Sequence, residues 1–409
     1  LTSLHHPFTL PNCSVDELKK ITREGMKALI MHEVGHTLGL NHNMKASVIY
    51  SPGQLADADF IKGKALSGSV MDYAAINLTL DPDKQGQYFD MAVGPYDIWA
   101  IQFGYTPFKN DQELTDLLVR STEPKLIFGN DADDMRSPGK GIDPRVMIND
   151  LSSDAVGYGI ERIEMTQELM KNLRATHTDG EISYQAMLGA YASLSGAYSS
   201  MVGIMSRYIG GVYVNRPFPN QPNAPQPYEP IPHFQQKRAM EALAKYAFAP
   251  NAMEVPSDLI PFLQQQRRGF GFFAKEEDPK MMNRVSRMQA DVLAHLLNPK
   301  TLLRISDTKE YGNRYVLTDM MGALTNAIFM EDLKSMVNSH RMILQEMYVK
   351  TLLAGALQAD KNPYDAISKA AMYGEITRIQ EMLKANPGTA EIKAHRSLLL
   401  KGIEKAQNN

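Results

Sequence analysis

Residues 32–42 read His-Glu-Val-Gly-His-Thr-Leu-Gly-Leu-Asn-His. His32 and His36 are four residues apart, so on a helix both imidazoles project from one face, one turn apart. Two nitrogens in that arrangement can share one zinc ion at about 2.0–2.1 Å. Glu33 lies beside the first histidine and can reach a water on the metal without taking a coordination site. The stretch therefore predicts a metal-binding helix with a carboxylate next to the metal.

The end of the stretch predicts a third ligand. Gly39 can adopt the left-handed conformation that ends a helix, after which the chain can return His42 towards the metal. Three protein ligands leave a fourth position for water, which is typical of catalytic zinc sites. Five matching residues at these offsets would arise by chance with a probability on the order of 10⁻⁵. The alternative is that they are surface histidines on an amphipathic helix.

The helix that carries the motif has a recognisable start. Ser14 suits the N-cap position, and Glu17 three residues later completes a capping box. Apolar residues then recur at helical spacing as far as Ile30. We expect one helix that runs from Ser14 through His36.

The composition is that of an ordinary folded protein. Of the 409 residues, 44% are hydrophobic and 22% are charged, and the net charge is −3. Because there is no basic excess, nucleic acid and anionic membranes are poor candidate partners. Residues 182–206 carry no charge but are rich in Ser, Gly and Ala, so we expect a buried helix there and no transmembrane span.

The rest of the chain predicts a mainly α fold, α+β overall, in three parts. Residues 1–110 would hold the metal-binding helix, a turn-rich loop and a second helix over 96–103. Residues 111–150 mix charged and turn-forming residues and are expected to form a linker or covering loop. Residues 151–409 are expected to form a helical C-terminal domain, with helices over 152–175, 182–209, 233–248, 279–297, 317–337 and 341–357. Short strand signals appear at 125–128 and 212–214.

An acidic run lies within the expected covering loop. Asp131, Asp133 and Asp134 offer oxygen ligands that calcium accepts, but the run lacks the glycine and the terminal glutamate of an EF-hand loop. A solvated acidic turn is the preferred interpretation.

Downstream of the histidine motif the chain reads Ser69-Val70-Met71-Asp72-Tyr73. The two stretches together resemble the extended signature of the metzincin clan of zinc metallopeptidases, in which a methionine-containing turn follows the histidines. The resemblance implies that Met71 lies beneath the three histidines as a hydrophobic base. It also implies that Tyr73 approaches the zinc and helps to stabilise the tetrahedral intermediate. Taken alone, Met71 would be assigned to the core.

Other segments resemble the bacterial Met-zincin family of zinc-dependent metallopeptidases. They are Gly-Pro-Tyr-Asp-Ile-Trp-Ala-Ile at 94–101, the run from Asp143 to Asp150, Ile-Gly-Gly-Val-Tyr at 209–213 and Gln-Gln-Lys-Arg-Ala at 235–239. Some metzincin families place Asp directly after the third histidine, whereas this chain has Asn43, which puts carboxylate support from that position in doubt. Kinship also implies an exported bacterial protein, either periplasmic, at the cell surface or secreted.

The resemblance further implies a part that lies upstream. Metzincins place the zinc helix at the end of an N-terminal subdomain, a twisted sheet whose edge strand binds substrate by β-augmentation. Because only 13 residues precede Ser14, we expect the sheet to be absent from this chain and to belong to an upstream domain of the same protein. This chain would then hold the metzincin C-terminal subdomain, with its zinc helix and Met-turn, followed by a helical domain. The metal-binding helix would be exposed on its sheet-facing side, and the chain alone would have little activity.

The expected function is that of a zinc-dependent endopeptidase acting on peptide or protein substrates. Glu33 would take a proton from the attacking water, and residues 74–77 would wall the pocket for the side chain that follows the scissile bond. Two alternatives stay open. One is a non-catalytic metal-binding scaffold or interaction module, and the other is a zinc hydrolase of a non-peptide amide.

Overall fold

The computed structural model describes residues 14–177, 183–219, 221–265, 278–333, 337–358, 360–384 and 388–408. These residues are mostly helical, and the mainly α expectation is confirmed. The helices are α1 Val15–Thr37, α2 Pro52–Leu55, α3 Ala58–Ile61, α4 Pro95–Tyr105, α5 Asp111–Leu118, α6 Ala155–Asn172, α7 Tyr184–Arg207, α8 His233–Leu243, α9 Met281–Leu296, α10 Pro299–Asp307, α11 Leu317–Phe329, α12 Ser339–Leu357, α13 Ala366–Lys384 and α14 Ala390–Gln407.

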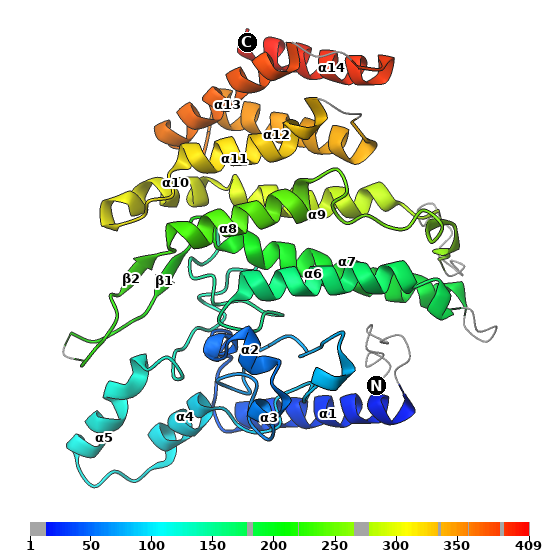
Figure 1. Ribbon diagram of the computed structural model, residues 1–409. Coiled ribbons are helices and arrows are strands. Elements are labelled where there is room, and N and C mark those ends of the chain that lie inside the picture. Colours follow the sequence, from blue (N-terminus) through cyan, green and yellow to red (C-terminus); the bar gives the residue numbers. More distant parts are fainter. Residues whose placement is uncertain are drawn as a thin grey trace.

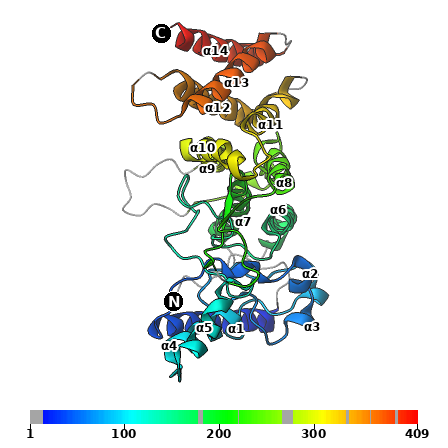
Figure 2. The same cartoon turned by 90° about the vertical axis from the view of Figure 1, so that its left-hand side faces the viewer.

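The helices form a stack that follows the order of the chain. Figure 1 and Figure 2 both show α1 to α5 at one end, α6 and α7 above them, and α9 to α14 continuing to the other end. Two short strands, β1 Val212–Val214 and β2 Tyr228–Pro230, pair antiparallel beside the stack, with Tyr213 opposite Glu229. The main hydrophobic core continues from Leu66 near α3 through α7 to Ile403 in α14. The layer that carries α1 therefore packs directly on the helical stack.

The motif-bearing helix α1 begins and ends where its sequence predicts. At the start, the Ser14 hydroxyl accepts a hydrogen bond from the Glu17 N–H at 3.1 Å. At the end, Gly39 has φ of +86°, and the N–H of Leu40 donates to the Gly35 carbonyl at 3.0 Å. This is the six-to-one hydrogen bond of a Schellman motif, which a glycine in the left-handed region permits. The turn reverses the chain immediately before His42.

In the structure, the Glu17 side chain does not complete the expected capping box. The Glu17 carboxylate accepts a hydrogen bond from the Tyr88 hydroxyl and pairs with Lys20 at 3.5 Å. These partners compete for the carboxylate that would otherwise reach back to the N-cap. Glu17 thereby ties the first turn of α1 to the loop that contains Tyr88.

One face of α1 is uncovered in the described part of the chain. Leu29, Ile30, Val34 and Leu38 are between 42% and 56% exposed, although all four are large apolar side chains. Only Ile21, Glu24, His32 and Gly35 are buried in this helix.

Most helices of residues 151–409 lie where the periodicity predicts them. The uncharged stretch forms α7, whose buried residues include Tyr191, Met201 and Met205. A π-helical turn, Ala244–Phe248, continues α8 to the expected end. Among the described residues, no helix is long and apolar enough to cross a membrane.

Two local expectations are wrong in detail. The strand expected at 125–128 does not form, because the Leu126 N–H closes a turn onto the Glu123 carbonyl at 2.8 Å and no neighbouring strand pairs with the segment. The expected covering loop also contains the helix α5, which Asn110 caps by accepting from the Glu113 N–H at 3.0 Å. The strand expected at 212–214 is β1.

Candidate metal centre

Three histidines meet at the C-terminal end of α1. His32 and His36 project from the helix, and His42 returns from the loop that follows Gly39. One nitrogen from each ring lies within 4.8 Å of the other two, and these are the residues in the described part of the chain that could together hold a metal ion. His32 is buried, His42 is half-buried and His36 is exposed.

The two helical histidines are oriented by main-chain carbonyls. His32 Nδ1 lies 2.8 Å from the Val70 carbonyl oxygen, and His36 Nδ1 lies 3.0 Å from the Leu40 carbonyl oxygen. A carbonyl only accepts hydrogen bonds, so each Nδ1 carries a proton, and in the neutral imidazole Nε2 then keeps the lone pair. This is the arrangement that orients a histidine for metal binding through Nε2.

The third histidine is held by side chains at both ring nitrogens. His42 Nδ1 donates to Asp131 Oδ2 at 2.8 Å, and its Nε2 lies 2.8 Å from the Tyr73 hydroxyl. Because a carboxylate only accepts here, Nδ1 carries a proton, and in the neutral ring Nε2 accepts from the Tyr73 hydroxyl. The hydrogen bond to His42 lowers the pKa of Asp131, so its carboxylate stays ionised.

His32 suits a metal ion by its charge state as well. Burial lowers the pKa of His32, and the neighbouring His36 and His42 lower it further, against the opposing effects of Val70 and Glu33. A neutral imidazole is the form that binds a metal. Three imidazole nitrogens within 4.8 Å of one another are a donor set that zinc accepts, so these residues fit the ion.

Met71 packs against α1 at Gly35, which makes room for it. Met71 is fully buried, and a Cβ atom placed on Gly35 would lie 2.3 Å from the Met71 sulfur. Gly35 is the residue before His36, so the thioether contacts the helix backbone between the two helical histidines. The Met71 carbonyl also accepts from the Asn43 N–H at 3.0 Å, which joins the turn to the residue after His42.

The turn that supplies Met71 is organised by Asp97 at the start of α4. One carboxylate oxygen accepts from the Ser69 hydroxyl at 2.5 Å, and the other accepts from the N–H groups of Val70 and Gly94 at 2.9 and 2.7 Å. Asp97 is 3% exposed. It therefore fixes Val70, whose carbonyl orients His32. The sequence signal for this residue was its place three positions after Gly94, where an acidic side chain caps a helix start.

Tyr73 and Glu33 face the same region from two sides. Tyr73 is 42% exposed, and burial together with the charges of Asp131 and Glu33 raises the pKa of its hydroxyl. Glu33 is exposed and follows His32 on α1. Both residues line a cavity of about 220 Å³ whose other walls are Gly25, Ala28, Leu29, His32, Leu66, Val70, Asp72, Ala74, Ala75, Phe89 and Asp90.

The residues that line this cavity only partly match residues 74–77, which the sequence predicted for the pocket wall. Ala74 and Ala75 line it, as the sequence predicted for residues 74–77. Ile76 instead lines a neighbouring cavity against α6 and α7, and the Asn77 side chain donates to the Leu55 carbonyl at 3.2 Å. Ala75 lines both cavities, so the segment passes between the two.

The acidic run is only in part the solvated turn that the sequence predicted, because Asp131 is exposed while the two other acidic residues pair with arginines. Asp133 pairs with Arg216 at 2.5 Å, and Asp134 is 2% exposed and pairs with Arg136 at 2.8 Å. Asp131 is the carboxylate that supports His42. Sequence reasoning missed it because it lies 89 residues beyond the histidine; no local spacing signals such a contact.

Asn43, the departure from the metzincin pattern, has a structural role. Its amide nitrogen donates to the Ile127 carbonyl at 3.1 Å, and its oxygen accepts from the Gly129 N–H at 3.2 Å. It is fully buried. Carboxylate support for the third histidine therefore comes from Asp131, on the segment that Asn43 holds.

Comparison with known proteins assigns the chain to a family. The sequence profile of the Met-zincin family matches residues 14–336, which include the three histidines, the methionine turn and the helices as far as α11. No curated protein and no solved structure matches the chain significantly. Because the match covers well over half of the sequence, the chain belongs to the Met-zincin family.

Proposed function

We propose that this chain carries the catalytic centre of a zinc-dependent endopeptidase. One observation supports the proposal above all: His32, His36 and His42 come together with each Nδ1 bound elsewhere, so each Nε2 can bind one ion once the Tyr73 hydroxyl moves away from His42 Nε2. Membership of the Met-zincin family implies zinc. When bound, zinc supplies a Lewis acid that polarises the scissile carbonyl and acidifies the attacking water.

Glu33 is the general base in this proposal. It is exposed beside the buried His32 and lies on the wall of the 220 Å³ cavity. From there its carboxylate takes a proton from the attacking water and delivers it to the leaving amide nitrogen. It makes no contribution to holding the ion, so its loss separates catalysis from metal binding.

Tyr73 supplies a hydrogen bond to the developing oxyanion. Its hydroxyl already donates towards the metal-facing nitrogen of His42 at 2.8 Å, so a small movement redirects it to a substrate oxygen. Loss of one such donor typically costs about 2.7–4 kcal/mol of transition-state stabilisation.

The 220 Å³ cavity takes the side chain that follows the scissile bond. Its walls are largely apolar, with Leu29, Val70 and Phe89 among them, and its volume suits one large side chain. Asp72 and Asp90 also line it, and burial raises the pKa of both carboxyl groups, that of Asp90 to about 6.

An upstream domain completes the cleft. The uncovered apolar face of α1, with Leu29, Ile30 and Val34, is the surface on which the sheet of a metzincin N-terminal subdomain would pack. That sheet would also supply the edge strand that aligns a peptide.

The test uses Glu33→Gln in the protein that includes its upstream region. We expect this variant to lose at least 100-fold in cleavage of a denatured protein, while zinc content by elemental analysis stays at the wild-type level. His42→Ala should instead lose zinc. Cleavage by Glu33→Gln at the wild-type rate would reject the role of Glu33, and a wild-type rate unaffected by a chelator would reject the metal mechanism.

A further inference from the structure

The three histidines differ in what holds the nitrogen that faces away from the ion. Main-chain carbonyls hold His32 and His36, so no side-chain substitution removes those acceptors. His42 is held by a side chain, Asp131, at 2.8 Å. One substitution can therefore release this ring without touching a ligand.

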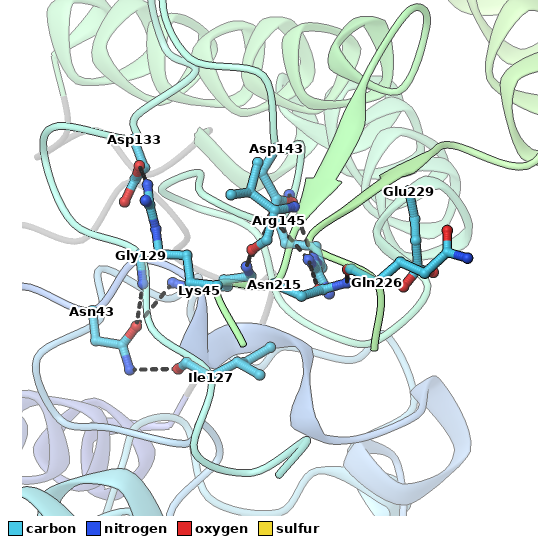
Figure 3. A network of polar contacts seen from close by, with 12 residues as sticks. Asn43, Lys45, Ile127, Gly129, Asp133, Asp143, Arg145, Asn215, Gln226 and Glu229 are labelled. Carbon is cyan, nitrogen blue, oxygen red and sulfur yellow. Dashed lines mark hydrogen bonds and ion pairs between the residues drawn. The ribbon is translucent and has the colours of Figure 1, made fainter. Parts of the chain in front are cut away.

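The segment that carries Asp131 is joined to the residues that follow His42. Figure 3 shows the Asn43 side chain between Ile127 and Gly129, with the hydrogen bonds described above. The Met44 N–H donates to the Gly129 carbonyl at 2.9 Å. A Cβ atom on Gly129 would lie 2.6 Å from the Val146 side chain, so a glycine is required for this close approach. The segment is thus fixed two residues before Asp131.

A buried ion pair fixes the same residues on their other side. Lys45 Nζ lies 2.8 Å from Asp143 Oδ2, with the two side chains 3% and 2% exposed. The ammonium also donates to the Val214 carbonyl at 2.6 Å, and Arg145 makes a second pair with Asp143 at 2.8 Å. Figure 3 shows this network beside β1. Separation of this pair would leave an uncompensated buried charge, so the pair holds the residues after His42 against β1.

Asp131 is oriented differently from the two acidic residues that follow it. Its Oδ2 faces His42, while Oδ1 lies 3.6 Å from Arg136, and Lys140 donates to its main-chain carbonyl at 3.2 Å. Asp133 and Asp134 are instead paired with cations, as described above. Of the three, only Asp131 touches the metal centre.

We propose that Asp131 is a positioning residue of the metal centre, which holds His42 in the tautomer and orientation that present Nε2 to the ion. This inference rests on the proposed zinc site. A carboxylate behind a metal-binding imidazole fixes the ring and increases its basicity, and loss of such a partner typically lowers metal affinity 10- to 100-fold. Without Asp131, the proton is free to move to Nε2 and donate to the Tyr73 oxygen, and the lone pair that faces the ion is then lost.

The experiment measures zinc affinity of the 409-residue chain by competition with a chromogenic chelator. We expect Asp131→Ala to bind zinc 10- to 100-fold more weakly than the wild type, and Asp131→Asn to lose less, because its amide oxygen still accepts from Nδ1. The matched control is Asp133→Asn, which removes a carboxylate from the same segment but one that pairs with Arg216. It should keep wild-type affinity.

A second measurement separates positioning from general stability. With Co²⁺ in place of zinc, the visible absorption spectrum should change in Asp131→Ala and stay unchanged in Asp133→Asn, because only the first alters the geometry at His42. Equal zinc affinity in Asp131→Ala and the wild type would overturn the inference alone. If Asp133→Asn weakened zinc binding equally, the inference would be overturned, and the segment would have a structural role only. A wild-type chain that fails to bind zinc would overturn the proposed function and the inference together.

Discussion

Helices α1 and α7 have nearly the same length but opposite environments. They contain 23 and 24 residues, yet α1 buries four of them and α7 buries eleven. The buried residues of α7 are mostly apolar and belong to the cores of the stack. In α1 only Ile21 is a buried large apolar residue, while His32 and Gly35 belong to the metal centre.

This difference distinguishes the helix that stabilises the fold from the helix that carries the metal centre. The position of α7 follows from packing, which rewards any well-fitting apolar side chain. The position of α1 follows from a few specific contacts, such as the cap at Ser14, the turn at Gly39 and the sulfur of Met71. Functional elements are often drawn from the less stable parts of a fold. We therefore expect changes in α7 to alter stability and changes in α1 to alter metal binding.

The largest expected effect comes from removing a core side chain of α7. Met205 is fully buried, so Met205→Ala should lower the free energy of unfolding by about 2–5 kcal/mol. Urea denaturation followed by circular dichroism measures this loss. Zinc affinity at a temperature where the variant is folded should equal that of the wild type.

The matched change in α1 is Met26→Ala, at a half-buried position. It should lower the free energy of unfolding by well under half as much as Met205→Ala, because less buried apolar surface is lost. Equal costs would show that α1 packs in solution as tightly as α7 and would remove the contrast.

An intermediate effect is expected from Gly35→Ala. In an open helix this change would stabilise by about 1 kcal/mol, because alanine is the better helix former. Here the new methyl group would lie 2.3 Å from the Met71 sulfur, so we expect a loss of about 1–3 kcal/mol from overpacking. Zinc affinity should also fall, since Met71 must move beneath His32 and His36. Chelator competition and urea denaturation together measure both effects.

The control is Gly189→Ala in α7. A Cβ atom at Gly189 would have no neighbour within 4 Å, so the free energy of unfolding should rise by up to about 1 kcal/mol. If Gly35→Ala were stabilising too, the methionine would not be in contact with the helix, and its assignment as the floor of the site would fail.

The same contrast explains what the sequence could predict. The histidine pair, the cap at Ser14 and the turn at Gly39 depend on spacings of three or four residues, and a helix converts such spacings directly into geometry. The helices of the stack can be predicted from the sequence for the same reason, because their apolar residues repeat with the helical period.

Contacts between distant segments were not predictable in this way. Asp131 reaches His42 across 89 residues, and its neighbours Asp133 and Asp134 have the same residue type but different partners. Asp97 and Gly35 act through contacts with the methionine turn, whose position depends on the whole layer. The strand expected at 125–128 failed for a related reason, since β-propensity yields a strand only where a partner strand is present.

The smallest effect is expected on the open face of α1, and it tests the comparison most directly. Ile30 is 56% exposed, so Ile30→Gln should change the free energy of unfolding by no more than about 0.5 kcal/mol. The identical change at Ile204, which is fully buried in α7, removes core contacts and buries an amide, so it should cost at least about 2 kcal/mol. Urea midpoints at unchanged slope report both values. A loss of more than about 1 kcal/mol in Ile30→Gln would mean that this face is covered in solution. Sedimentation would then show whether a second copy of the chain covers it, because burial of an apolar face between copies makes stability depend on protein concentration.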